Sequence, residues 1–232
     1  MNKANINKAI IFDAGTLISL SMNGLIDELR KLKKIFNGNF LITSQVKAEI
    51  IDNPLKIKQF ELEALRTRKL LEDGILELAE SLGFNNSAIQ SESEKIMNTS
   101  NSLFQSSRGE VKIMHLGEAS CIALSKMLNE KKIKNLIAID ERTTRMLIEK
   151  PENLKDLLSR KLHTNIRSLK SNFEYFKEFS VIRSVELVYV LWKKGLMELN
   201  DGINVLDALL YALKFKGCSV SSDEIEEIKR MK

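Results

Sequence analysis

The sequence KAIIFDAGTLI, residues 8–18, begins with a short and almost purely apolar run that ends at Asp13. Such a run is typical of a buried strand in a parallel sheet. A second run of this kind, residues 136–139, ends in the same way at Asp140. Ligands of open parallel sheets gather at the carboxyl ends of the strands, so we expect the two carboxylates to meet at one edge.

Three further short apolar runs, at residues 40–42, 75–78 and 179–182, predict additional strands, and amphipathic helices alternate with them. This alternation favours an α/β fold, with a three-layer α/β/α arrangement around a central parallel sheet. We expect one domain over residues 1–232 with two helical or polar inserts. The insert near 85–107 is rich in Ser and Asn, and we expect it to be the least structured segment or a polar helix over the active face. The insert near 151–178 is charged and helical in pattern.

Composition narrows the class of protein. The chain is 44% hydrophobic and no apolar run reaches the ~18 residues that span a bilayer. The polar N-terminus lacks the apolar core of a signal peptide, so we expect a cytoplasmic protein without membrane contact. Cys121 and Cys218 lie in apolar helical patterns, which predicts buried thiols rather than a disulfide. The net charge of +5 is compatible with a polyanionic partner, and equally with a solvated Lys-rich surface.

Two more acids are placed to join Asp13 and Asp140. Glu49 lies just over one turn into the helix after the second strand, and Glu118 lies near the start of a helix. Four converging carboxylates would repel one another strongly unless a divalent cation neutralised them. Oxygen ligands favour Mg2+ or Mn2+, and the chemistry that fits is in-line phosphodiester hydrolysis. Each acid alone is equally compatible with an ordinary helix cap or turn residue.

Four segments carry a resemblance to a known family. They are residues 10–18 (IIFDAGTLI), 42–50 (ITSQVKAEI), 116–124 (LGEASCIAL) and 136–145 (LIAIDERTTR). In this order they resemble the four acidic motifs of PIN-domain nucleases, and they are most similar to the ribonuclease toxins of bacterial and archaeal toxin–antitoxin pairs. The family generally has a Gly- or Thr-bearing turn after the last strand, where this chain has Arg183-Ser184.

The resemblance implies roles for nine positions. Asp13, Glu49, Glu118 and Asp140 would be the catalytic, metal-binding acids, and Glu141 a further ligand. Thr16, Ser44, Arg142 and Arg145 would contact the substrate. The implied cofactor is Mg2+ or Mn2+ and the implied substrate is RNA. An antitoxin protein and a homodimer are the partners that the resemblance adds.

Other readings stay open at this point. A PIN-like scaffold that binds RNA or a protein partner without cutting it is the main alternative to a metal-dependent endoribonuclease. His115 precedes the Glu118 helix and is either structural or close to the metal site. The basic residues of the second insert either grip RNA or form a solvated helix face. They are Arg160, Lys161, Arg167, Lys170 and Lys177.

Overall fold

A computed structural model describes residues 7–107, 109–168, 170–199 and 201–231, and the side chains of residues 170–172 lie outside the described set. The polar N-terminal segment, for which the sequence predicted no signal peptide, also lies largely outside the described residues. At the centre is a parallel five-stranded sheet with strand order β3-β2-β1-β6-β8. The strands are β1 (Lys8–Phe12), β2 (Asn39–Ile42), β3 (Glu77–Leu78), β6 (Lys134–Ala138) and β8 (Val181–Ile182). The α/β class and the parallel sheet are therefore confirmed.

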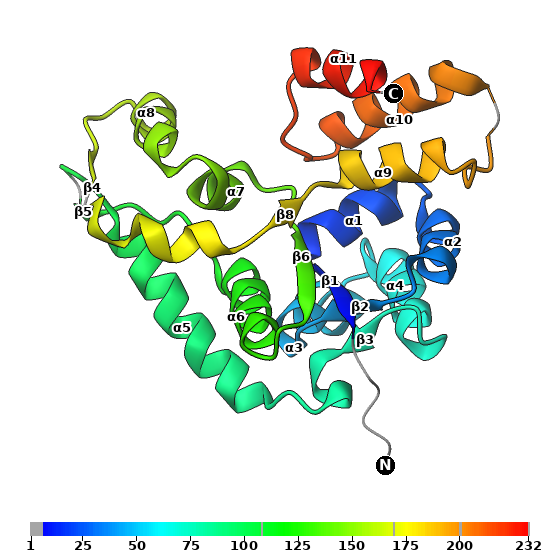
Figure 1. The fold of residues 1–232 in the computed structure, drawn as a ribbon, viewed down its shortest axis with the longest axis horizontal. Helices are drawn as coiled ribbons and strands as arrows, with labels where there is room; N and C mark the ends of the chain where they lie inside the picture. The colour runs from blue at the N-terminus through cyan, green and yellow to red at the C-terminus, as the bar shows by residue number, and fades with distance from the viewer. Residues whose placement is uncertain (1–6, 108, 169, 200, 232) are drawn as a thin grey trace.

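Helices flank this sheet on both sides (Figure 1). The helix α6 (Leu116–Glu130) packs against β1 and β6, and α5 (Asn86–Ser102) packs outside it. The opposite side carries α1 (Ala14–Met22), α2 (Ile26–Phe36), α4 (Glu61–Glu72) and α9 (Ser184–Lys193). Between the layers, the β1 residues Ile11 and Phe12 are fully buried, as expected for a strand covered on both faces.

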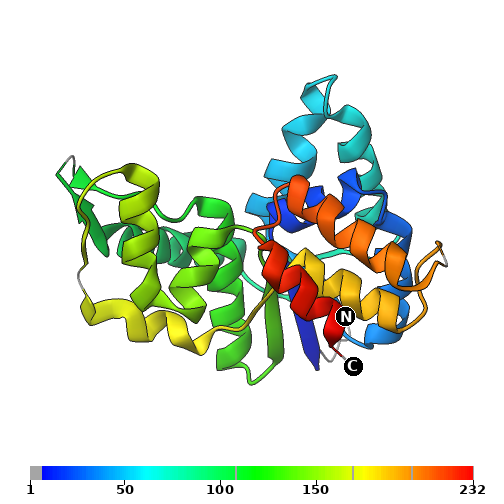
Figure 2. The ribbon, with the colours of Figure 1, turned by 90° about the horizontal axis from the view of Figure 1, so that it is seen from above.

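The remaining elements form two groups on either side of the sheet (Figure 2). One group holds α7 (Arg142–Glu149), α8 (Pro151–Leu162) and the 3-10 segment η4 (Lys170–Glu178), together with a small antiparallel sheet. That sheet consists of β4 (Phe104–Ser106), β5 (Gly109–Glu110) and β7 (Arg167–Ser168). The other group holds α10 (Gly202–Phe215) and α11 (Ser222–Arg230). Shorter helical turns are α3 (Ser44–Lys47), η1 (Ala48–Asp52), η2 (Pro54–Lys56) and η3 (Ala79–Leu82).

The structure refines two expectations. The polar insert near 85–107 is not unstructured, because most of it is the 17-residue helix α5. The insert near 151–178 is helical as expected, but it also contributes β7 to the second sheet. After Gly217 the chain continues into α11, with Ser221 as its N-cap. No helix in the described ranges is long and apolar enough to cross a bilayer.

Candidate active site

Two of the predicted acids flank the point where the strand order reverses. From β1 the chain proceeds through β2 to β3 on one side, and it then crosses to β6 and β8 on the other. In such sheets the crevice outside the carboxyl ends, at this switch point, is the usual ligand site. Asp13 directly follows β1 and Asp140 follows β6 by two residues, so the structure brings both to this crevice, as the sequence predicted.

Helix geometry brings Glu49 and Glu118 to the same place. Glu118 is in the first turn of α6, whose N-terminus faces the carboxyl edge of the sheet. Glu49 lies in η1, a π-helical turn that interrupts the helix after β2. Such turns are rare in proteins as a whole, but many of those that occur lie at functional sites. Gly117 makes room for this carboxylate: a Cβ atom at Gly117 would lie only 2.7 Å from Oε2 of Glu49.

The acids line one cavity of about 460 Å³. Its wall includes Asp13, Glu49, Glu118, Asp140 and Glu141, which are all five of the predicted ligands. Lys216 is the one Lys or Arg among the residues that line it, and the exposed His115 also contributes to the wall. Five carboxylates facing one lysine make this an electronegative crevice that suits a cation with a preference for oxygen.

The electrostatic conflict is concentrated on Asp13. Burial, together with the nearby carboxylates of Glu118 and Glu49, raises the pKa of Asp13 to about 7, although hydrogen bonds from the backbone oppose the shift. Burial likewise raises the pKa of Glu118. Cys121 lies behind the cavity with its pKa raised well above the usual value by burial and by Asp13, so it stays a thiol. A raised carboxylate pKa in a cleft is a physical mark of a functional site.

Each acid also has a local hydrogen-bonding role. Asp13 caps α1 by accepting from the backbone N–H of Gly15 at 3.0 Å, and Glu118 accepts from the backbone N–H of His115 at 2.8 Å. Glu141 caps α7 by accepting from Thr144 at 2.7 Å. Glu49 accepts from Gln45 at 2.9 Å. Among the described residues, no three His, Cys, Asp or Glu side chains are grouped so as to hold a metal ion in these side-chain positions.

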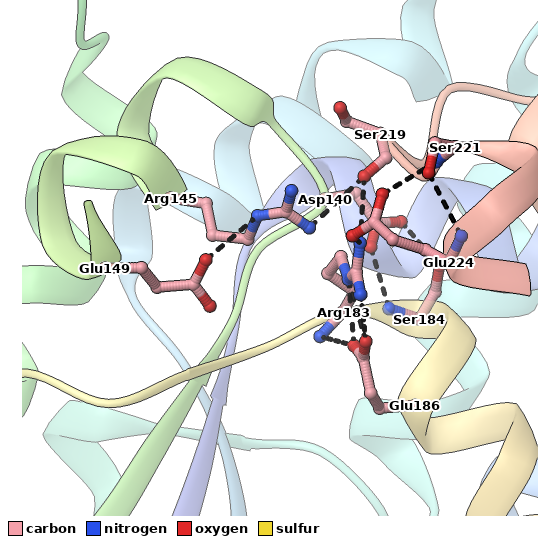
Figure 3. Close-up of polar contacts among 9 residues, drawn as sticks. All are labelled: Asp140, Arg145, Glu149, Arg183, Ser184, Glu186, Ser219, Ser221 and Glu224. Atoms are coloured by element: carbon pink, nitrogen blue, oxygen red, sulfur yellow. Dashed lines mark hydrogen bonds and ion pairs between the residues drawn. The ribbon is translucent and has the colours of Figure 1, made fainter. Parts of the chain in front are cut away.

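Asp140 is held by the residue that follows the neighbouring strand. Its Oδ1 accepts from the backbone N–H of Ser184 and its Oδ2 from the hydroxyl of Ser184, both at 2.7 Å. Figure 3 shows this pair beside a network in which Arg183 donates to Glu186, to Glu224 and to the carbonyl oxygen of Ser219. Ser184 thus fixes the orientation of Asp140, and Arg183 connects the segment before α11 to the ends of the strands.

The four predicted substrate contacts do not line this cavity. Thr16 is fully buried and donates to the carbonyl oxygen of Ala138 at 3.0 Å, so it joins β1 and β6 instead of facing solvent. Ser44 donates to Glu80 and lines a separate small cavity. Arg145 is 8% exposed and spans the carbonyl oxygen of Ser219 and the carboxylate of Glu149 (Figure 3). Each of these three side chains is committed to a structural contact and does not face the acidic cavity.

Arg142, the fourth predicted substrate contact, also lies outside the cavity wall, but its side chain has no such structural contact among the described residues. It is exposed at the start of α7 and lines a neighbouring cleft that shares Glu141 with the acidic cavity. The sequence analysis missed Lys216, which follows α10, and Ser184. A signal for Ser184 was present, since it lies two residues after β8, just as Asp140 lies two residues after β6. For Lys216 there was none, because only the packing of α10 brings it to the sheet edge.

Comparisons with known proteins add no family assignment: no protein-family model, characterised protein or solved structure matches this chain.

Proposed function

We propose that this protein is a divalent-metal-dependent nuclease that hydrolyses RNA, with Asp13, Glu49, Glu118 and Asp140 as the metal-holding acids. One observation carries the proposal: acids from two strand ends, a helix start and a π-helical turn line a single cavity at the switch point of the sheet. Four separate elements contribute them, so their convergence is not a consequence of one local motif.

The donor set fits Mg2+ or Mn2+. Carboxylate oxygens are the ligands that these hard cations prefer, and the raised pKa of Asp13 marks a negative charge that the protein alone leaves uncompensated. A bound cation of this kind neutralises phosphate charge and makes water a better nucleophile at neutral pH. The roles of the residues follow from their positions: Ser184 orients Asp140, Gly117 leaves space for Glu49, and Lys216 supplies a positive charge at the wall for a phosphate oxygen.

The choice of RNA draws on the resemblance of the four acidic segments to PIN-domain ribonucleases, with support from the net charge of +5. The same resemblance makes an antitoxin partner and a homodimer predictions for this chain. The cavity itself is suited to any phosphodiester, so the substrate has to be established by experiment.

A cleavage assay tests the proposal. Labelled single-stranded RNA would be incubated with Mn2+, with Mg2+ or with a chelator, beside the Asp13→Asn variant as a control for contaminating nuclease. We expect cutting that requires metal and is lost by a factor of at least a hundred in the variant. Activity that survives both the chelator and the substitution would refute the assignment of these acids.

A second candidate is a non-cleaving scaffold that binds RNA or a protein. The observation in its favour is that every acid of the cavity already has a hydrogen-bond partner in the protein, so each can serve a structural role without a cation. Isothermal titration with Mn2+ separates the two candidates. Binding that disappears in Asp13→Asn supports the nuclease, whereas a wild-type protein that neither binds Mn2+ nor cuts RNA supports the scaffold.

A further inference from the structure

A basic cleft lies beside the acidic cavity. It has a volume of about 470 Å³ and is lined by Glu141, Arg142, Thr143, Leu157, Arg160 and Lys161. Arg142 precedes Arg160 by 18 residues and Lys161 by 19. They meet because the chain reverses at Lys150 between α7 and α8. The start of α7 and the end of α8 therefore face the same space. Glu141 lines both the cleft and the acidic cavity, so the two are contiguous.

These three cations have no carboxylate partner among the described residues. Arg142, Arg160 and Lys161 are all exposed, and the one polar contact of the three is from Nε of Arg160 to the carbonyl oxygen of Asp156 in its own helix, at 3.3 Å. Glu141 is the one carboxylate of the cleft, and it is engaged in capping α7. The positive charge of this cleft is thus uncompensated within the described structure.

A second cavity shows that the cations of this protein are not generally left without carboxylate partners. Arg30, Arg66 and Lys69 line a cavity of about 510 Å³ between α2 and α4. There each cation has a carboxylate within 4 Å: Arg30 pairs with Asp73, Arg66 with Glu63 at 3.5 Å, and Lys69 with Asp73 at 2.7 Å. The same residue types are neutralised at that site and left unpaired next to the acidic cavity.

We propose that the α7–α8 cleft binds the phosphate backbone of the substrate strand next to the phosphate that is cut. This inference rests on the proposed function and extends it, because it assigns a substrate-binding site to the charged insert. Arg142 and Arg160 present guanidinium groups suited to phosphate oxygens, and Lys161 adds a point charge. The contacts are with phosphates, so the cleft reads neither base nor sugar.

The adjacency of the cleft to the five carboxylates favours a nucleic acid over an acidic protein. A strand must bring one phosphate to an electronegative cavity, and cations next to that cavity compensate the repulsion that its neighbouring phosphates would meet. An acidic peptide has no such reason to lie there. Poly-glutamate is therefore the control ligand that separates the two classes.

Binding of a fluorescently labelled 12-mer of uridylate tests the inference. It would be measured by anisotropy in the presence of chelator, over a range of salt concentrations, for the wild type and for Arg142→Gln/Arg160→Gln/Lys161→Gln. Loss of three phosphate contacts should lower the slope of log affinity against log salt by about 2 and the affinity roughly tenfold or more. A 12-mer of thymidylate should lose the same factor.

The matched control is Arg66→Gln/Arg68→Gln/Lys69→Gln on α4. It also replaces two arginines and one lysine, here on an exposed helix on the other side of the sheet. The change in net charge is therefore identical. We expect it to bind almost as the wild type does. Equal losses in both variants, or no loss in the cleft variant, would overturn the proposal, as would poly-glutamate competing as well as RNA of equal charge.

Kinetics distinguish failure of this inference from failure of the nuclease. In the Mn2+ assay the cleft variant should have a raised KM and an almost unchanged kcat, because its side chains hold the strand away from the reacting phosphate. If the wild type cuts RNA and the cleft variant has an unchanged KM, the cleft proposal is wrong and the nuclease stands. If the wild type never cuts but only the cleft variant loses RNA binding, the nuclease is wrong and the cleft stands.

Discussion

At the scale of single residues, Asp13 couples the chemistry of the cavity to the stability of the protein. Its pKa is about 7 in the folded protein against 3.8 in an unfolded chain, so the folded protein binds this proton more tightly. The free energy of unfolding therefore falls as pH rises from about 4 to about 7, and the cost above pH 7 approaches ~4 kcal/mol as an upper bound. Asparagine mimics the neutral carboxyl and escapes this cost.

We therefore expect metal-free Asp13→Asn to be more stable than metal-free wild type at pH 8, and nearly equal to it at pH 4.5. Urea unfolding with chelator present measures both differences. Groups distant from Asp13 titrate alike in both proteins, so their contributions cancel in the comparison. A variant that is less stable than the wild type at both pH values would show that Asp13 acts as a helix cap and carries no electrostatic cost.

At the scale of elements, α6 and the π-helical turn η1 meet at Gly117 and Glu49. An alanine at Gly117 would place Cβ at 2.7 Å and 2.9 Å from the two carboxylate oxygens of Glu49, at the end of a flexible side chain that can move aside. Alanine is also the better helix former by up to ~1 kcal/mol. We expect Gly117→Ala to leave stability unchanged or raised, while Mn2+ affinity and cleavage fall about tenfold.

The Glu49→Gln background supplies the control for this prediction. If the methyl group acts by displacing the Glu49 carboxylate, Gly117→Ala should change Mn2+ affinity little once that carboxylate is gone. Calorimetric titration of the four proteins gives the coupling free energy directly. Additive effects would mean that Gly117 influences the site by another route, such as the start of α6.

The sequence predicted those elements whose formation depends on the local pattern of apolar and polar residues. Apolar runs ending at Asp13 and Asp140 placed both acids at one sheet edge, because strands of a parallel sheet share a direction. The sequence left α5 open between an unstructured segment and a polar helix, because its buried stripe alternates Ile89 and Ile96 with the small residues Ser93 and Ser100. That spacing is helical once serine is counted as a buried small residue.

Residue roles were less predictable than elements, because they depend on contacts between distant segments. The burial of Arg145 follows from its contact with Ser219, 74 residues away, and the pairing of Arg142 with Arg160 and Lys161 follows from the α7–α8 reversal. Neither contact has a signature in local sequence. The resemblance assigned both Arg142 and Arg145 to substrate contact, whereas the structure leaves Arg142 exposed in a cleft beside the acidic cavity and buries Arg145.

At the scale of the whole molecule, the acidic cavity draws on elements from both sides of the sheet. The residues come from the ends of β1 and β6, from α6 and from η1, so a cation held among them would bind only the folded chain. A ligand present at a hundred times its Kd then adds about 2.7 kcal/mol to the free energy of unfolding. For a chain of this size that corresponds to a rise in Tm of roughly 5–10 °C.

If the proposed site binds a cation, protons compete with it at Asp13, and the Asp13 pKa of about 7 sets the pH range of that competition. The rise in Tm caused by Mn2+ should therefore be small at pH 6 and near its full value at pH 8, by contrast with a surface effect, which would vary little over this range. Thermal unfolding with Mn2+ or chelator at both pH values measures it, with Asp13→Asn/Asp140→Asn as the control that should show no rise. An equal rise at both pH values, or a rise in the double variant, would place the cation elsewhere on the molecule. A rise confined to the wild type above pH 7 would show that the carboxylates needed for the proposed chemistry bind the cation in the folded protein and stabilise it.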